Sequence, residues 1–340
     1  MWLRDELLRR FPALQSLPPH SVAVGGAIRD LLIGRKPADV DVECDEPESC
    51  ARAIGKVIPL GRGDLKVYRA VRGDLVYDFS ERTELGRRDF TINAIALDLT
   101  TAELRDPFDG EPDIRRRVVR MIRPENFQDD PLRMLRAVRL ALQFDFTIDE
   151  TTVTAIRRRA ARVVTMAAER VTYELNATFA LNKFRTALRL LGNTGLDEPL
   201  FGYAIDESRF FADDVPPAGA YALLLRDPKQ FAERWKWSRD LLRDVTTLQR
   251  LMRDTDLLAI YEAGPQIGSQ LSALFRATGR EAPPMPDFTM RPLLDGDEIA
   301  RISGATGPAV GKLKRALIEA QLLGKVRTRA AAQRLVEDRL

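Results

Sequence analysis

The chain has 340 residues, a length that predicts two or three domains with enough apolar material for a sizeable core. Hydrophobic residues make up 45%, charged residues 30%, and the net charge is only +3, which is typical of a soluble globular protein. No stretch approaches the roughly 18 apolar residues of a membrane span. The single histidine, His20, excludes a multi-histidine metal site. Cys44 and Cys50 lack zinc-site spacing, so we expect reduced thiols in a cytoplasmic protein.

The first part of the chain alternates helical and strand-like segments. The N-terminal MWLRDELLRRFPAL has the apolar spacing of an amphipathic helix and contains acids, unlike a secretion signal. A β-branched run then ends at two glycines, and a helix of about two turns is closed by Gly34. We therefore expect a helix within residues 1–14, a strand over 21–24, a helix over 27–34 and a strand over 38–43.

A hairpin and a long helical region follow. The β-rich runs on either side of Arg72-Gly73-Asp74 predict two antiparallel strands within residues 66–81. Residues 91–107 begin like a helix and continue as a strand and a turn. From about residue 129 onward the apolar spacing is almost entirely helical, with a proline-rich joint at residues 282–288. The sequence therefore predicts an α+β protein, with a small mixed module before a long helical body.

Asp39 and Asp41 stand two residues apart on an expected strand. Side chains at i and i+2 of a strand face the same side, so the two carboxylates project together and their like charges repel. A cation such as Mg²⁺ relieves this repulsion when substrate phosphates complete its coordination. By itself the spacing more often marks two exposed strand acids, so neighbouring residues have to decide.

Gly25 and Gly26 end one strand and open a helix just before this pair. Glycine permits close backbone approach, and a helix N-terminus offers free N–H groups to phosphate. Arg29 lies one turn further on. The segment matches neither the Walker loop nor the dinucleotide-binding fingerprint. A phosphate-binding turn beside a metal-binding pair suits attack by a hydroxyl on a nucleotide α-phosphate. Asp78, on the second arm of the hairpin, is the candidate third catalytic carboxylate, with an ordinary edge-strand acid as the alternative.

With these residues identified, the chain resembles the class II tRNA nucleotidyltransferases, the CCA-adding enzymes, and the related bacterial poly(A) polymerases. GGAIRD with ADVDV is similar to the first motif of that family, which implies that Asp39 and Asp41 bind the metal. RRDFTINAIALD, residues 87–98, resembles the motif that contacts the sugar and phosphates of the nucleotide. DDPLRMLRAVR resembles the nucleotide-selecting motif, and ERVTYEL resembles the helix-bracing motif behind it.

The resemblance implies domains, partners and residue roles. It implies a nucleotidyltransferase head over residues 1–124, a nucleotide-selecting neck over 125–185, a tRNA-binding body over 186–285 and a tRNA-binding tail over 286–340. The implied cofactor is Mg²⁺, and the implied partners are tRNA, CTP and, for addition of a final A, ATP. Nucleotide binding is implied for Gly25, Gly26, Arg29, Arg87, Arg88, Asp89, Asn93, Asp130, Arg133 and Arg136, and structural support for Glu169, Arg170 and Glu174.

The chemistry of nucleotide selection follows from Asp130 and Arg133, which we expect on one helix face because they are three residues apart. A carboxylate accepts from an exocyclic amino group, and a guanidinium donates to a ring nitrogen or carbonyl. C and A carry an amino donor beside a ring acceptor, whereas U and G place the opposite groups there. The pair would thus reject UTP and GTP by leaving polar groups unpaired. An ordinary helical ion pair is the alternative.

The chain departs from the family pattern at two places, and the second of them affects the expected product. Asp129-Asp130 stands where the family has Glu-Asp. Only the segment Ser80–Gly86 separates the hairpin from Arg87, where relatives that add the terminal A carry a longer flexible loop. The resemblance therefore implies CC addition, with a separate A-adding enzyme as a partner in the same cell. A full CCA-adding enzyme and a poly(A) polymerase are the alternatives within the family.

Basic segments spread along the chain favour a long polyanion as the partner. In the tail, Lys312, Lys314 and Arg315 follow the GPAVG turn and are candidate RNA phosphate contacts, although a solvated basic helix face explains them equally well. Two other classes stay open. A non-catalytic RNA-binding relative would be expected to lose the aspartates or the RRD block, and a small-molecule nucleotidyltransferase would not need basic helices.

Overall fold

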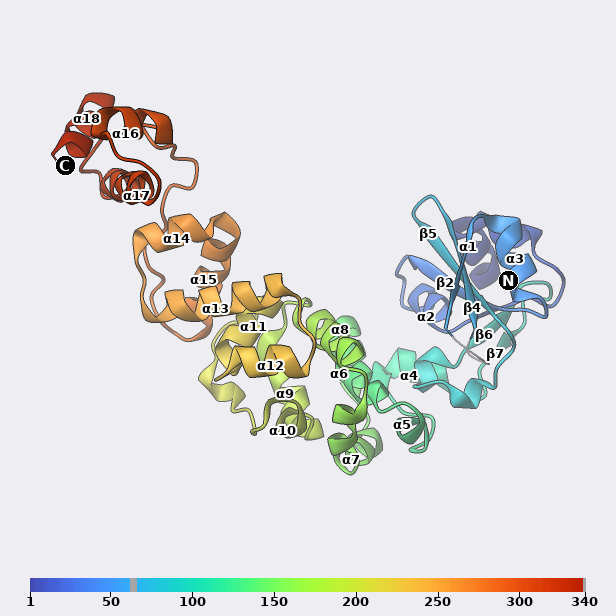
Figure 1. Ribbon diagram of the computed structural model, residues 1–340. Helices are drawn as coiled ribbons and strands as arrows, with labels where there is room; N and C mark the ends of the chain where they lie inside the picture. Colours follow the sequence, from blue (N-terminus) through green and yellow to red (C-terminus); the bar gives the residue numbers. More distant parts are fainter. Residues whose placement is uncertain (62–65, 339–340) are drawn as a thin grey trace. The chain divides into compact units, whose positions relative to one another are not determined.

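The computed structural model describes residues 1–61 and 66–338, which form two compact units (Figure 1). One unit comprises residues 1–174 and 189–205, and the other comprises residues 175–188 and those from 206 onward. The expected α+β class is confirmed, because the mixed sheet lies in the N-terminal part and helices follow. No helix among the described residues is long and apolar enough to cross a membrane.

The first unit contains the sheet and the helices that surround it. Its strands are β1 (Val22–Val24), β2 (Asp39–Glu43), β3 (Val57–Leu60), β4 (Val67–Arg72), β5 (Leu75–Ser80), β6 (Ala96–Asp98), β7 (Leu104–Arg105), β8 (Val118–Val119) and β9 (Thr147–Ile148). Its helices are α1 (Trp2–Arg10), α2 (Gly26–Leu32), α3 (Pro47–Ile54), α4 (Gly110–Arg116), α5 (Asn126–Asp129), α6 (Leu132–Phe144), α7 (Glu150–Arg157) and α10 (Asp197–Phe201), with 3₁₀ helices η1 (Pro12–Ser16), η3 (Leu85–Arg87), η4 (Thr91–Asn93) and η5 (Ala160–Thr165).

The second unit is helical. Helices α8 (Ala168–Phe179) and α9 (Phe184–Thr194) have residues in both units. The further elements are η6 (Glu207–Arg209), α11 (Pro217–Leu224), α12 (Pro228–Arg234), α13 (Arg239–Arg253), α14 (Leu257–Ala263), α15 (Pro265–Ala277), α16 (Gly296–Ser303), α17 (Pro308–Leu322) and α18 (Arg329–Glu337).

The main sheet has the strand order β3-β4-β5-β2-β1-β6-β7. β2 and β5 pair in parallel, with Asp41 beside Asp78, and the other neighbours pair antiparallel. The predicted hairpin is confirmed, since Arg72 pairs with Leu75 across a turn at Gly73, whose φ of 61° favours glycine. Side chains alternate along each strand, so this register decides which residues share a face.

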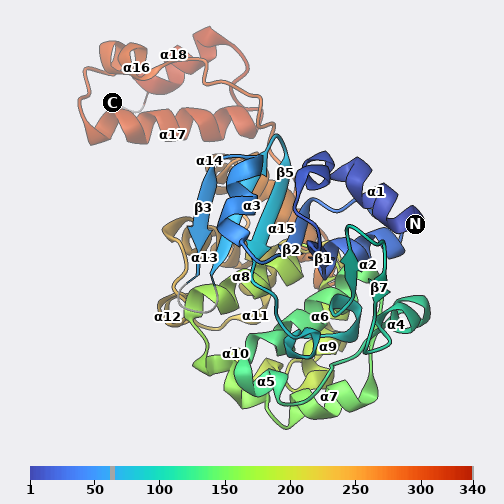
Figure 2. The same ribbon diagram turned by 90° about the vertical axis from the view of Figure 1, so that its right-hand side faces the viewer.

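The two faces of the sheet differ in chemistry. Tyr77 and Phe79 are buried on one face, where Phe11 packs edge-on against Tyr77 at 5.5 Å. Helix α3 packs against β4 and β5, and Figure 2 shows it beside β5. Asp78 lies between these two aromatic residues in β5 and therefore points to the other face. By register, Asp39 and Asp41 of β2 share that second face. The apolar face anchors the sheet, and the opposite face carries the carboxylates.

Two prolines set helix boundaries near this sheet, namely the end of α1 and the start of α6. The N-terminal helix stops at Arg10 because Phe11 precedes Pro12 and takes a non-helical φ of −122° and ψ of 72°. The expectation that Asp130 and Arg133 lie on one helix is wrong. Asp130 has an extended backbone, with φ −142° and ψ 92°, and α6 begins only at Leu132. Pro131 explains the difference, because the residue before a proline is disfavoured in the helical region.

An aromatic cluster forms part of the core of the second unit. Tyr221 packs edge-on against Phe179 at 5.5 Å and lies 4.4 Å from Trp237. Burial raises the pKa of Tyr221, and its hydroxyl donates to Asn176 Oδ1 at 2.8 Å. A buried polar group of this kind needs such a partner.

The proline-rich joint before the last three helices is packed rather than free. Phe288 stacks on Tyr261 with the rings 6.5 Å apart and 6° from parallel, and Tyr261 donates to the carbonyl of Met290. Helix α16 then begins with a capping box formed by Asp295 and Glu298.

Substituting Gly110 by alanine should lower the free energy of unfolding by about 1–3 kcal/mol. A Cβ at this first residue of α4 would clash with the carbonyl oxygen of Thr91 and lie 2.9 Å from Ile95 Cγ1, so α4 or η4 would have to move. Denaturant unfolding followed by circular dichroism measures the change. Gly296→Ala at the start of α16 is the control, since its Cβ would meet nothing within 4 Å. Equal stability of the two variants would contradict the prediction.

Candidate active site

The carboxylates of β2 form the centre of the candidate site. Asp39 is exposed and Asp41 is half-buried on the same face of the strand. Burial raises the pKa of Asp41 to about 6, and Asp39 and Asp78 add to this effect, while the nearby Arg88 works against it. A carboxyl group held above its ordinary pKa beside a second acid marks a place where a cation is favoured.

Asp78 occupies the neighbouring position in β5 but already has a partner. Its two carboxylate oxygens accept hydrogen bonds from Arg69 Nε and Nη2 at 2.8 and 2.7 Å, and the two residues pair across β4 and β5. Such a bidentate pair satisfies the charge of the carboxylate. Asp78 thus faces the same side as Asp41, but a guanidinium compensates it.

The donor set fits a metal that takes part of its coordination from a substrate. Among the described residues, no group of three or more His, Cys, Asp or Glu side chains is arranged to hold a metal ion. Asp39 and Asp41 supply two carboxylates, and Mg²⁺ is commonly held by one or two carboxylates together with substrate phosphates and water. This pair therefore fits such a cation in the presence of a phosphate-bearing ligand.

The glycine turn lies beside these aspartates because β1 pairs with β2 and matches Val24 with Asp41. Gly25 has φ 74° and ψ −125°, a conformation that glycine adopts most easily. A Cβ on Gly25 would lie 2.5 Å from Arg88 Nη1, so the guanidinium rests directly on the turn. A glycine is required here both by the backbone and by the approach of Arg88.

A buried network connects the predicted nucleotide-binding residues. Arg29 Nη1 donates to Asn93 Oδ1 at 2.5 Å, Asn93 Nδ2 donates to Asp89 Oδ1 at 2.9 Å, and Arg136 Nη2 lies 3.0 Å from Asp89 Oδ2. Burial acts to raise the pKa of Asp89, but Arg136 and the hydrogen bonds from Asn93 and the Phe90 amide outweigh it and hold the pKa below its usual range. The network joins α2, the RRD segment and α6.

The charged side chains in and near this network differ in their burial and in their partners. Arg29 is buried and also pairs with Asp30, and Asp89 is buried within the protein. Arg87 is exposed at the end of η3. Arg88 and Arg136 each keep a buried Nε without a hydrogen-bond partner. Guanidinium groups suit phosphate oxygens, so Arg87, Arg88 and Arg136 remain the candidates for a phosphate-bearing ligand.

The predicted selecting residues are linked through the backbone, because the amide of Arg133 donates to the carbonyl of Asp130 at 3.1 Å, while their side chains have different partners. Arg170 Nη2 binds Asp130 Oδ2 at 2.8 Å, and Arg133, on the first turn of α6, donates to the carbonyl of Asn126 at 3.2 Å. Burial lowers the pKa of Arg133, although Asp89 and Asp130 counteract this effect. Behind them Glu174 binds Arg139 Nε at 2.7 Å, whereas Glu169 is exposed on α8.

The predicted tail residues lie on one helix. Lys312, Lys314 and Arg315 are in the first half of α17, which begins at Pro308 after Gly307. Lys312 is exposed, and Arg315 forms an ion pair of 2.8 Å with Glu262 of α14. Any RNA contact by Arg315 therefore competes with Glu262.

Sequence reasoning missed two residues that support the site. Glu43 continues the alternation of Asp39 and Asp41 on β2 and contacts Arg88, a signal that the spacing already contained. Asn126 is fully buried and donates to the carbonyl oxygens of Gly86 and Arg88 at 2.9 and 2.6 Å. No sequence pattern indicated Asn126, because its partners lie about 40 positions away and meet it only in the fold.

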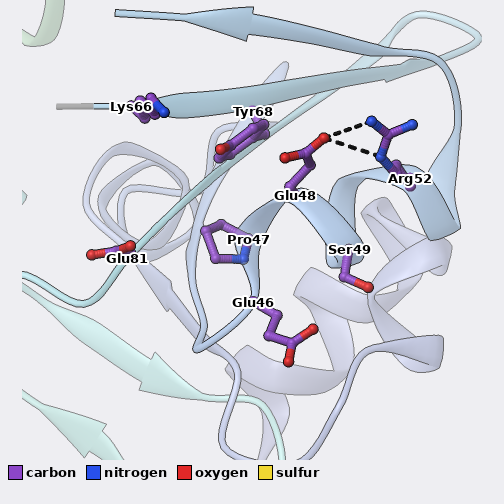
Figure 3. Close-up of a pocket in the computed structure, with 8 residues that line it drawn as sticks. All are labelled: Glu46, Pro47, Glu48, Ser49, Arg52, Lys66, Tyr68 and Glu81. Carbon is purple, nitrogen blue, oxygen red and sulfur yellow. Dashed lines mark hydrogen bonds and ion pairs between the residues drawn. The ribbon is translucent and has the colours of Figure 1, made fainter. Parts of the chain in front are cut away.

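A separate pocket of about 530 Å³ lies on the other face of the sheet (Figure 3). Its lining includes Tyr68 of β4 and the Glu48–Arg52 ion pair of α3. Tyr68 pairs with Phe79 and so points away from Asp78. This pocket is therefore not part of the carboxylate site.

Comparisons with known proteins show which family the chain resembles. Residues 66–120 match the family model described as the Poly A polymerase head domain, and residues 145–205 match the model described as the probable RNA and SrmB-binding site of polymerase A. The chain is 30% identical to the A-adding tRNA nucleotidyltransferase of Deinococcus radiodurans, over 98% of this chain and 99% of that relative. It is 38% identical to the CC-adding tRNA nucleotidyltransferase of Synechocystis sp., over 48% of this chain and 42% of that relative.

A solved structure is similar over nearly the whole chain. The crystal structure of the Bacillus stearothermophilus CCA-adding enzyme in complex with CTP superposes with a TM-score of 0.78 at 25% identity. The match covers 99% of this chain and 97% of that one. The likeness of fold therefore extends over the sheet and the helical parts.

Divalent-cation binding should weaken as the pH falls below about 6. The raised pKa of Asp41 means that this group holds a proton below that pH, and a cation must displace it, so affinity should fall roughly tenfold per pH unit. Calorimetric titration with Mg²⁺ at about pH 5 and about pH 8 measures the effect. Asp41→Asn should remove the pH dependence, and an affinity that is constant in the wild type across this range would contradict the prediction.

Proposed function

This chain belongs to the class II tRNA nucleotidyltransferases, and we propose that it transfers nucleotides from CTP to the 3′ end of tRNA without a template. The observation that supports this reaction best is the pair Asp39 and Asp41, which share one face of β2 beside the Gly25 turn. Attack of a terminal hydroxyl on a nucleotide α-phosphate needs a cation at the reacting oxygens and positive charge at the leaving phosphates. The site contains carboxylates that could hold the cation and arginines that could supply the positive charge.

We propose Asp39 and Asp41 as the ligands of Mg²⁺. When bound, such a cation neutralises the charge that develops on the reacting phosphate oxygens. The chain itself contributes the ionised Asp41 and the guanidinium of Arg88, which lowers the pKa of Asp41. Arg87, Arg88 and Arg136 would bind the triphosphate, and the glycine turn would let the phosphates approach the backbone.

We propose that Asp130 and Arg133 choose the base. Asp130 precedes α6, and Arg170 orients its carboxylate. Arg133 lies on the first turn of α6. An acceptor and a donor held in this way match C and A and leave polar groups unpaired against U and G. Glu174 supports the pair indirectly, since it holds Arg139 of α6.

We propose CC addition as the product. The segment between β5 and η3 is short: β5 ends at Ser80 and η3 begins at Leu85. Relatives with both A-adding and CC-adding names resemble this chain, so their names do not choose between the products. The short segment leaves little chain to reshape the base site from C to A, and a separate A-adding enzyme would then complete the tRNA.

We propose that RNA contacts come from basic helical surfaces rather than from base-specific pockets. Double-stranded RNA is recognised mainly by shape and by phosphate and 2′-hydroxyl contacts. Lys312 and Lys314 lie on α17 of the tail, where they can meet phosphates. Arg315 would have to leave Glu262 to do the same.

The product can be tested with a tRNA transcript that lacks its 3′ CCA. With CTP alone the enzyme should add two residues and stop, and adding ATP should not lengthen the product. A transcript ending in CC should accept no A. Efficient incorporation of the final A would show a full CCA-adding enzyme, long A tracts would show a poly(A) polymerase, and no incorporation would contradict nucleotidyl transfer.

The carboxylates can be tested in the same assay. Asp39→Asn and Asp41→Asn should each slow incorporation on the order of 10³-fold, because metal binding supplies several kcal/mol of charge stabilisation. Asp78→Asn should cost only about tenfold, since Arg69 already compensates that carboxylate. Thermal unfolding confirms that the variants fold. A loss for Asp78→Asn as large as that for Asp41→Asn would place Asp78 among the metal ligands.

A further inference from the structure

Glu43 is a buried carboxylate in the third position of the acidic face of β2. It follows Asp39 and Asp41 at the same two-residue spacing, and its exposed fraction is only 5%. A charge with so little access to water requires ion-pair or hydrogen-bond partners. Its partners therefore indicate what it does.

Two partners converge on one oxygen of Glu43. Thr83 Oγ1 donates to Glu43 Oε1 at 2.8 Å, and Arg88 Nη2 donates to the same oxygen at 3.2 Å. Thr83 belongs to the short segment between β5 and η3, and Arg88 belongs to the RRD motif. One buried side chain on β2 thus contacts both parts of the chain that follow the hairpin.

The contact with Arg88 fixes the direction of its guanidinium. Nη2 is held by Glu43, while Nη1 lies 2.5 Å from where a Cβ of Gly25 would be, directly on the glycine turn. The backbone carbonyl of Arg88 accepts from Asn126 at 2.6 Å. The buried Nε has no hydrogen-bond partner. Arg88 is therefore fixed at its backbone and at one end of its guanidinium, and the other end, Nη1, lies at the glycine turn.

A metal-binding role does not fit Glu43. Its Oε1 is already engaged by Thr83 and Arg88, and the guanidinium of Arg88 compensates the charge of the carboxylate. The geometry instead matches a charge-assisted hydrogen bond that orients a guanidinium.

We propose that Glu43 is a positioning residue, which holds the guanidinium of Arg88 on the Gly25 turn for the nucleotide phosphates. Through its hydrogen bond with Thr83, the same carboxylate also fixes the segment from Ser80 to Gly86. The inference rests on the proposed function, since it assigns Arg88 to the phosphates of CTP. It makes the short segment an anchored part of the nucleotide site, so its position and that of Arg88 are coupled through one oxygen atom.

The first test separates CTP binding from tRNA binding. Glu43→Ala should raise the KM for CTP roughly tenfold, the value for a lost hydrogen bond to a charged group, and leave the KM for tRNA unchanged. Thr83→Val should raise the KM for CTP about threefold, and Thr83→Ser, which keeps the hydroxyl, should restore it. Asp45→Asn is the matched control, because Asp45 contacts the same segment through Arg82 at the surface.

The second test asks whether Glu43 acts through Arg88. In a double-mutant cycle, Glu43→Ala should add nothing to the CTP effect of Arg88→Ala. Additive effects, or equal KM increases for CTP and tRNA, would overturn the proposal, because a purely structural role predicts them. If Glu43→Ala does not fold, Glu43→Gln decides, since it keeps a neutral acceptor. Calorimetric CTP binding should then weaken about threefold, and unchanged binding would overturn the proposal.

These outcomes are distinct from a failure of the proposed function. If the wild-type enzyme adds no nucleotide to tRNA, the proposed reaction is wrong, and the CTP-binding measurements without tRNA still test the link between Glu43 and Arg88. If the wild-type enzyme is active and the variants behave like Asp45→Asn, only the positioning role is wrong.

Discussion

The buried carboxylate of Asp89 joins three segments that are distant in the sequence. Asn93 connects it to Arg29 of α2, and Arg136 connects it to α6. A carboxylate in this environment stays charged because a guanidinium and several donors compensate the loss of water. If Asp89 lost Arg136, the RRD segment would lose its ion pair with α6, and a buried carboxylate would be left with fewer donors.

The carboxylates near the sheet differ in the partners that neutralise their charge. Arg69 neutralises Asp78, Arg88 and Thr83 satisfy Glu43, and Arg136 with Asn93 satisfies Asp89. Asp41 instead keeps a raised pKa, because its burial is not fully offset by Arg88, and Asp39 is exposed. Of these five carboxylates, the pair on β2 is the one that gains most from a bound cation.

The residues of the site come from a strand, a turn, a 3₁₀ segment and the start of a helix, and neighbouring side chains hold several of them. Asn126 holds the backbone of the RRD segment, and Arg170 orients Asp130. Sites whose ligand-contacting groups are fixed in advance lose less entropy when substrate binds.

The sequence by itself determined the elements around the site and the family of the chain. The alternation of ADVDVE, the glycines before AIRDLL and the turn at Gly73 predicted β2, α2 and the β4–β5 hairpin, because strand and helix periods and glycine turns are local properties. The ordered motifs predicted a class II tRNA nucleotidyltransferase, which the comparisons confirm. The three-residue spacing of Asp130 and Arg133 suggested one helix face wrongly, because Pro131 disfavours a helical backbone at Asp130 and α6 begins only at Leu132.

Only the tertiary structure decided which partner each charged side chain has. Arg69 with Asp78, Arg136 with Asp89 and Arg170 with Asp130 are separated by 9 to 47 positions in the chain. No periodicity connects such residues, since their contacts arise when strands pair and helices pack. Burial then sets the strength of each interaction and the pKa of Asp41, because the dielectric environment of a side chain is a property of the fold and not of its neighbours in sequence.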